Sequence, residues 1–82
     1  MIPSDIVFQQ LHLADPYGAT EEALRVTVSG SLAGRPVGNS ELSDALRRLE
    51  ARRFATSTRN DDSDLIWSLT TEGRTEAQRR FR

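Results

Sequence analysis

The stretch that most restricts the fold of this chain runs from Asn39 to Arg74. It reads NSELSDALRRLEARRFATSTRNDDSDLIWSLTTEGR and predicts an amphipathic helix, a strand, a polar turn, a second strand and the first turn of another helix. Few small folds contain a helix that leads directly into a two-stranded hairpin. The rest of the chain is therefore best interpreted as the support for this unit.

The helix of this stretch is predicted over about 39–53, with Asn39 or Ser40 as its N-cap residue. One apolar stripe with the spacing i, i+3, i+4 and i+7 must face the core, and it consists of Leu42, Ala45, Leu46 and Leu49. The remaining faces are then exposed to solvent. They carry Ser43, Asp44, Arg47 and Arg48, with Glu41 and Glu50 at the sides.

A hairpin is predicted over 54–69, because two alternating segments flank a polar turn. We expect strands at Phe54–Arg59 and Asp64–Leu69, joined by the Asn-Asp-Asp-Ser turn of residues 60–63. Trp67 lies on the apolar face of the second strand, so we expect it to pin the hairpin onto the helices. A role as a base-stacking platform is the weaker interpretation, because no second aromatic lies beside it.

A last, short helix is predicted after the hairpin. Thr70 is its expected N-cap residue, and Glu72 lies at its positive end. Gly73, Ala77 and Phe81 recur at i, i+4 and i+8 on one side of this helix. The small residues predict a close approach to the rest of the domain.

The N-terminal segment predicts a helix over Ser4–Ala14, with Ser4 as N-cap residue and a stop at the Asp-Pro-Tyr-Gly sequence of residues 15–18. Its apolar stripe consists of Val7, Leu11 and Ala14. His12 is the only histidine, and cysteine is absent, so the ligand set of a metal site is missing. We expect His12 to be a solvated or core-edge residue.

Residues 20–33 allow two interpretations. Thr20 could cap a helix whose buried stripe consists of Leu24, Val28 and Leu32. A strand is the alternative, because Leu24, Val26, Val28 and Leu32 also fit a period of two and the Val-Thr-Val run favours it. We prefer the helix, since a helix-turn-helix needs one before the helix over 39–53. Glycines and Pro36 predict a loop over 30–38, which could add a short strand at Arg35–Val37 to the hairpin.

Charge is distributed unevenly, although the net charge is only −1. Residues 1–34 carry one Arg and four acids (net −3), and residues 60–71 carry three acids and no Arg (net −3). Residues 35–59 carry six Arg and three acids (net +3), and residues 72–82 carry four Arg and two acids (net +2). Positive charge is thus expected on the helix before the hairpin and on the C-terminal tail.

Length and composition predict one small domain over residues 1–82 that folds without disulfides. Such a small core is marginally stable, and pairing with another chain would stabilise it. The N-terminal MIPSDIVFQQ has no basic leader and no long apolar run, so we expect a cytoplasmic protein with no membrane contact. We expect neither a cofactor nor enzyme activity, because no phosphate-binding glycine loop, paired-carboxylate signature or Ser/His/Asp arrangement is visible in the sequence.

At LRRLEARRF (46–54) and LIWSLTTEGR (65–74), the chain resembles winged-helix regulators of the MarR and PadR type. Their recognition helix typically ends in "LxxLExxG" and their second wing strand in "YxLTxxGR". The counterparts here are Leu46, Leu49 and Glu50, followed by Trp67, Leu69, Thr70, Gly73 and Arg74. The fold implied by the resemblance is an α+β winged helix-turn-helix with three helices, a two- or three-stranded hairpin wing and a short C-terminal helix.

The resemblance further implies a dimeric transcription regulator that binds double-stranded DNA. The helix over 39–53 would enter the major groove, and the hairpin over 54–69 would touch the backbone or minor groove. Carried over by position, the base-facing candidates are Ser40, Ser43, Asp44 and Arg47. The candidates for phosphate or wing contacts are Arg48, Thr58, Arg59 and Asn60.

Three features depart from the family pattern. Arg53 stands where relatives usually have a glycine, the hairpin turn carries Asp61, Asp62 and Asp64 where relatives often have arginine, and the chain stops just after Phe81 without a long dimerisation helix. Three acids near phosphate would repel it. The alternative function is therefore a winged-helix module that binds a protein partner through its acidic wing and does not bind DNA.

Overall fold

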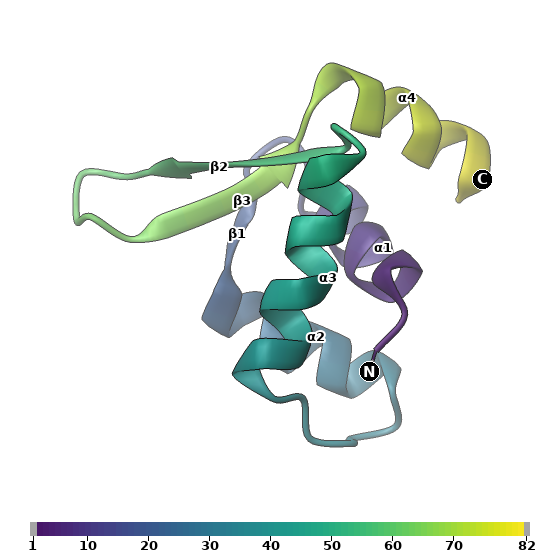
Figure 1. The fold of residues 1–82 in the computed structure, drawn as a ribbon, viewed down its shortest axis with the longest axis vertical. Coiled ribbons are helices and arrows are strands. Elements are labelled where there is room, and N and C mark those ends of the chain that lie inside the picture. Colours follow the sequence, from purple (N-terminus) through teal and green to yellow (C-terminus); the bar gives the residue numbers. More distant parts are fainter. Residues whose placement is uncertain (1, 82) are drawn as a thin grey trace.

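The computed structural model describes residues 2–81, which form four helices and a three-stranded antiparallel sheet. In chain order the elements are α1 (Ser4–Ala14), β1 (Ala19–Thr20), α2 (Glu21–Ser31), α3 (Asn39–Ala51), β2 (Ala55–Arg59), β3 (Leu65–Leu69) and α4 (Thr71–Arg80). The hairpin of β2 and β3 projects to one side of the helices, and α4 packs on α1 at one end of the molecule (Figure 1). The expected α+β class and the order of the four helices and the two hairpin strands are confirmed.

The first helix has the bounds that the sequence predicts. Val7, Phe8 and Leu11 are buried, and the helix ends where the Asp15-Pro16 bond and Gly18 redirect the chain. Ser4 is not the N-cap residue, however, because that position is occupied by Pro3 in an extended conformation and no side chain caps the helix. Proline fixes φ near the value required there, so Ser4 becomes the first helical residue.

Within residues 20–33, Glu21–Ser31 form a helix, so the strand alternative is wrong. The Thr20 hydroxyl accepts a hydrogen bond from the Ala23 backbone N–H at 3.1 Å, as expected of an N-cap residue. Leu24 and Val28 are fully buried, whereas Val26, which a period of two would bury, is 67% exposed. Burial at i and i+4 together with the cap outweighs the β propensity of the Val-Thr-Val run.

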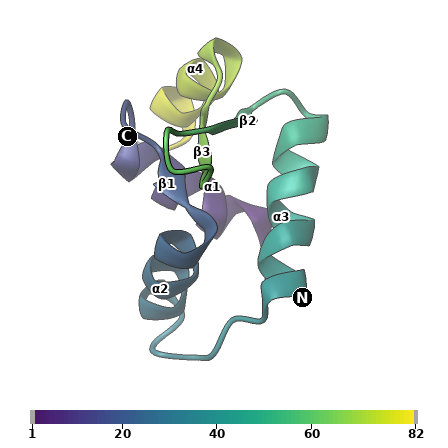
Figure 2. The same ribbon diagram turned by 90° about the vertical axis from the view of Figure 1, so that its left-hand side faces the viewer.

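The third strand of the sheet is β1, and the strand expected at Arg35–Val37 does not form. The sheet has the order β1-β3-β2, with Ala19 opposite Trp67 and Thr20 opposite Ile66. The loop from α2 to α3 passes the far end of the helices from the hairpin, so it cannot reach the sheet (Figures 1 and 2). Val37 is buried in the core instead.

The third helix begins and ends one or two residues from its predicted bounds. Its N-cap residue is Gly38, not Asn39 or Ser40, and the Glu41 carboxylate accepts a hydrogen bond from the Gly38 backbone N–H at 3.3 Å. The helix ends at Ala51, where the sequence predicted about 53. Arg53 then adopts φ of 64°, and the next backbone N–H, of Phe54, bonds back to Leu49 at 3.0 Å. Arg53 thus takes the left-handed conformation that glycine adopts most easily.

The fourth helix is held against the start of the hairpin. Thr70 caps it as predicted, because its hydroxyl oxygen accepts a hydrogen bond from the Gly73 backbone N–H at 2.9 Å. A Cβ atom on Gly73 would lie 1.9 Å from the carbonyl oxygen of Phe54. The close approach that the small residues predict is therefore confirmed. Phe81 packs edge-on against Phe8, with ring centroids 5.4 Å apart, and closes this end of the core.

We expect Gly73→Ala to destabilise the fold by about 2–4 kcal/mol, because the added methyl group collides with backbone that cannot move independently. Gly30→Ala is the matched control. It lies in α2 with open space around its Cβ position, so it should leave the free energy of unfolding unchanged or raise it by up to ~1 kcal/mol. Urea unfolding measures both. Equal effects of the two substitutions would contradict the close contact.

Candidate functional site

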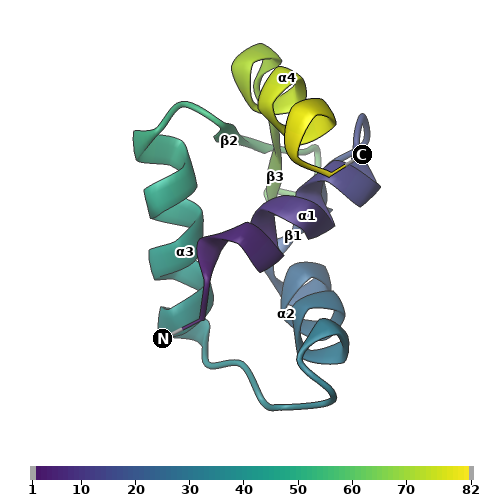
Figure 3. The same ribbon diagram turned by 90° about the vertical axis from the view of Figure 1, so that its right-hand side faces the viewer.

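The outer face of α3 is the most open helical surface beside the hairpin. Burial of Leu42, Ala45, Leu46 and Leu49 fixes the rotation of the helix. Ser40, Asp44, Arg47 and Ala51 then follow one exposed line along the opposite side. Figures 2 and 3 show α3 standing at one edge of the molecule along its long dimension. We call these four residues the outer line of α3.

A polar hollow of about 260 Å³ separates α3 from the sheet. It is lined by Ser43, Arg47 and Glu50 of α3, Ser57 and Trp67 of the sheet, and Glu21 of α2. Ser43, predicted to face bases, is half-buried and belongs to this hollow. Arg47 belongs to the outer line and also lines this hollow.

Trp67 connects the sheet to the start of α2. Its side chain is 5% exposed, and its Nε1–H donates a hydrogen bond to the Glu21 carboxylate at 3.2 Å. The predicted core-edge role is confirmed, and the exposed stacking platform is wrong. The contact joins the start of α2 to β3.

Arg48 lies on the side of α3 that faces away from the hairpin. Its Nη2 donates to the Ile2 carbonyl oxygen at 3.1 Å and its Nε donates to the Asp44 carbonyl oxygen at 3.3 Å. The side chain is half-buried by these contacts. The two adjacent arginines of α3 therefore have different environments, because the Arg47 side chain is exposed and the Arg48 side chain is bonded to the N-terminal segment.

The wing candidates Thr58, Arg59 and Asn60 are exposed at the end of β2 and the start of the turn. The Asn60 side-chain oxygen accepts hydrogen bonds from the backbone N–H groups of Asp62 at 3.0 Å and Asp64 at 2.9 Å. Arg59 donates to the Ser63 carbonyl oxygen at 2.9 Å. Two of the three candidates thus hold the shape of the turn.

The turn end of the hairpin is acidic on the side of α2. A second hollow, of about 340 Å³, is lined by Thr20, Glu21, Glu22, Asp64 and Leu65. Three carboxylates face this space, while Asp61 and Asp62 are exposed at the turn. Negative potential therefore surrounds the wing, and an anionic partner would approach from the side of α3.

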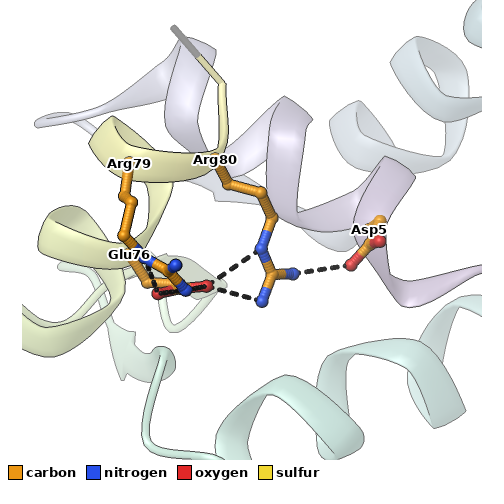
Figure 4. Close-up of polar contacts among 4 residues, drawn as sticks. All are labelled: Asp5, Glu76, Arg79 and Arg80. Carbon is orange, nitrogen blue, oxygen red and sulfur yellow. Dashed lines mark hydrogen bonds and ion pairs between the residues drawn. The ribbon is translucent and has the colours of Figure 1, made fainter.

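The arginines of α4 are used inside the domain. Arg74 donates two hydrogen bonds of 2.8 Å to the Asp15 carboxylate. Glu76 accepts from both Arg79 and Arg80, and Arg80 reaches across to Asp5 on α1 at 2.8 Å (Figure 4). The predicted positive tail is thereby neutralised by acids of α1 and α4; Arg82 lies outside the described residues.

These contacts change the ionisation of two carboxyl groups. Hydrogen bonds from Arg74 hold the pKa of Asp15 below its ordinary value of 3.8. Hydrogen bonds from Arg79 and Arg80 likewise hold the pKa of Glu76 below 4.5. The arginines that make no ion pair or side-chain hydrogen bond within residues 2–81 are Arg47, Arg52 and Arg53. Arginines without a hydrogen-bond or ion-pair partner among residues 2–81 are thus found on the outer line of α3 and just after that helix.

Within residues 2–81, no cluster of three or more His, Cys, Asp or Glu side chains could hold a metal ion. No helix among these residues is both long and apolar enough to cross a membrane. His12 is half-buried beside Phe81, with ring centroids 5.8 Å apart, as a core-edge histidine.

No protein-family model matches the sequence, and no curated protein matches it. Solved structures do resemble the fold. A candidate DNA-binding protein of Ralstonia eutropha JMP134 superposes with a TM-score of 0.73 at 18% identity, over 100% of this chain and 99% of that one. F-93 of SSV1 gives a TM-score of 0.72 at 18% identity, over 96% of this chain and 82% of F-93.

A variant of ZitR from Lactococcus lactis gives a TM-score of 0.68 at 17% identity. The superposition covers 98% of this chain and 51% of ZitR, so the chain spans about half the length of that protein. These likenesses support the fold expected from the LRRLEARRF and LIWSLTTEGR motifs. The chain has a winged-helix fold, in which the β2–β3 hairpin is the wing.

The Asp15–Arg74 pair should make stability depend on pH. Because the pKa of Asp15 is lowered by folding, its contribution is present above its unfolded value near 3.8 and is lost as pH falls through the lower folded value. Asp15→Asn should cost about 1 kcal/mol at pH 7, with the cost shrinking below pH ~4. Urea unfolding between pH 7 and pH 2.5 measures this difference.

Asp61→Asn is the control, because Asp61 is exposed and makes no ion pair within the described residues. It should leave the free energy of unfolding nearly constant across the same range. A cost of Asp15→Asn that does not change with pH would contradict a role for the ionised pair.

Proposed function

We propose that this protein is a cytoplasmic transcription regulator that binds double-stranded DNA as a homodimer, with α3 in the major groove and the hairpin over 54–69 as the wing. The observation that carries the proposal is the outer line of α3, which presents an arginine without a partner among residues 2–81 beside a projecting hairpin. The fold likeness to a candidate DNA-binding protein of similar length supports the same assignment.

The dimensions of α3 suit a major groove. Its 13 residues correspond to a rod about 20 Å long, and the groove is about 12 Å wide and admits one helix. The buried leucines hold the helix on the core, so the backbone of α3 loses little conformational entropy when side chains of the outer line meet base edges. Ser40, Asp44 and Arg47 would reach bases directly, and Ser43 would contribute from the edge of the hollow.

The other candidates would contact the backbone. Thr58 and Arg59 lie on the exposed face of the wing, and Asn60 fixes the turn that carries them. Arg48 is the candidate on α3 for a phosphate contact, and its guanidinium is also bonded to the Ile2 carbonyl oxygen. A single domain contacts few base pairs, so a homodimer that binds two half-sites would supply the missing affinity.

The acidic side of the wing limits this binding. Asp61, Asp62 and Asp64 would oppose phosphates, so we expect weak affinity for random duplexes and a steep loss of binding as salt is added. Under this proposal, specific sites bind because contacts of α3 offset the repulsion at the wing.

Arg47→Ala should reduce affinity for duplex DNA at low salt about tenfold and weaken its sequence preference. Arg79→Ala is the matched control: it removes the same charge from α4, where Arg79 is bonded to Glu76, and it should leave DNA binding unchanged. Fluorescence anisotropy with a mixture of duplexes measures both. No binding by the unaltered protein at high micromolar concentration, or equal losses in the two variants, would contradict the proposal.

A second function is favoured by the acidic turn. Asp61 and Asp62 are exposed, Asp64 lies near Glu22, and Asn60 holds the turn in one shape. Such a surface would fit a basic segment of a partner protein. If it is the functional surface, changing the three aspartates to lysine should abolish capture of that partner while Arg47→Ala has no effect. An unchanged complex would argue against this alternative.

A further inference from the structure

We infer that the outer line of α3 reads a C·G base-pair step, with the Asp44 carboxylate accepting from cytosine and the Arg47 guanidinium donating to guanine. This inference rests on the proposed DNA binding and specifies its target. It starts from an anomaly in the charge pattern, namely an acid in the middle of the surface that must approach an anionic polymer.

No contact of the Asp44 side chain among residues 2–81 explains why an acid stands at this position. Among residues 2–81 its carboxylate makes no hydrogen bond or ion pair, and only its main-chain carbonyl is used, by Arg48. Arg47 lies three residues further along and makes no ion pair with it. Both side chains are exposed and available to a ligand.

The chemistry of base edges limits what Asp44 can meet. An ionised carboxylate only accepts hydrogen bonds, and phosphate oxygens offer it none. In the major groove, guanine and thymine present acceptors, adenine presents a donor next to an acceptor that repels a carboxylate, and cytosine presents its N4 amino group. Cytosine is therefore the base that fits Asp44.

Arg47 has the complementary preference. Its guanidinium is donor-only, and guanine presents two adjacent acceptors, O6 and N7, that match its fork. The two residues are separated by three positions, or about 4.5 Å along the helix axis, against about 3.4 Å between stacked base pairs. They would thus reach the same or adjacent base pairs, and both requirements are met by a C·G step.

Glu50 and Glu21 are the other charged groups near Arg47, because they line the hollow beside it. Neither lies on the outer line, and Glu21 is already bonded to the Trp67 indole. Their carboxylates attract the Arg47 guanidinium toward the hollow, so guanine would have to compete with them for this side chain.

The test is selection of binding sites from random duplexes with the unaltered protein and with Asp44→Asn. The asparagine amide has nearly the same shape but both donates and accepts, so it pairs with adenine N6 and N7. We expect the unaltered protein to enrich a motif with adjacent cytosine and guanine. The variant should change cytosine to adenine at one position, by about tenfold or more, and keep the guanine.

Asp61→Asn on the wing is the matched control, because it makes the same charge change away from α3. It should strengthen binding to all duplexes and leave the motif unchanged. If Asp44→Asn and Asp61→Asn give the same motif as the unaltered protein, the inference is wrong while DNA binding stands. If none of the three proteins enriches any sequence, the proposed DNA binding itself fails.

Discussion

Burial of the apolar stripe of α3 is the interaction on which the rest of this structure depends. Leu42, Leu46 and Leu49 are almost completely buried, and a helix with one side fixed in this way has no freedom in what it exposes on the other. Ser40, Asp44 and Arg47 face solvent because those leucines face the core. The same packing places the start of β2 directly after the helix, so the hairpin leaves from a defined point.

Electrostatics then decides which surface can meet a partner. Four segments of alternating charge in the sequence become an acidic region at the turn end of the hairpin near α2 and a small basic region on α3. The arginines of α4 do not enlarge this basic region, because Asp5, Asp15 and Glu76 bind them. The surface available to DNA is consequently narrow, and specificity would have to come from few side chains. Asp44 and Arg47 are suited to such specificity because each side chain matches one kind of base edge.

The fold could be predicted from sequence largely because its strongest signals are local. The periodicity of α3, the strand-turn-strand pattern and the Thr70 cap each specify an element within a few residues. The errors at Ser4 and at the start of α3 arose because the preceding Pro3 and Gly38 can take the extended N-cap conformation, which weakens any assignment based on Ser or Asn alone. The strand β1 was not predicted because two residues are too few to show an alternating pattern. It is a strand only because the tertiary structure places Ala19 beside Trp67.

The sequence also predicted a positively charged C-terminal tail. It did not show that this charge is neutralised, because the acids that bind the arginines of α4 include residues far away in the sequence. Arg74 and Asp15 are separated by 59 positions, so no local pattern pairs them. The sequence alone likewise does not distinguish Arg48, held by Ile2, from its neighbour Arg47. The base-facing roles of Ser40, Ser43, Asp44 and Arg47 remain predictions. NMR titration of the labelled protein with a selected duplex tests whether α3 and the wing contact DNA. We predict changes in amide chemical shift along Ser40 to Arg47 and at the wing, with α4 unaffected. Changes confined to α4, or to the acidic turn, would contradict this DNA-binding surface.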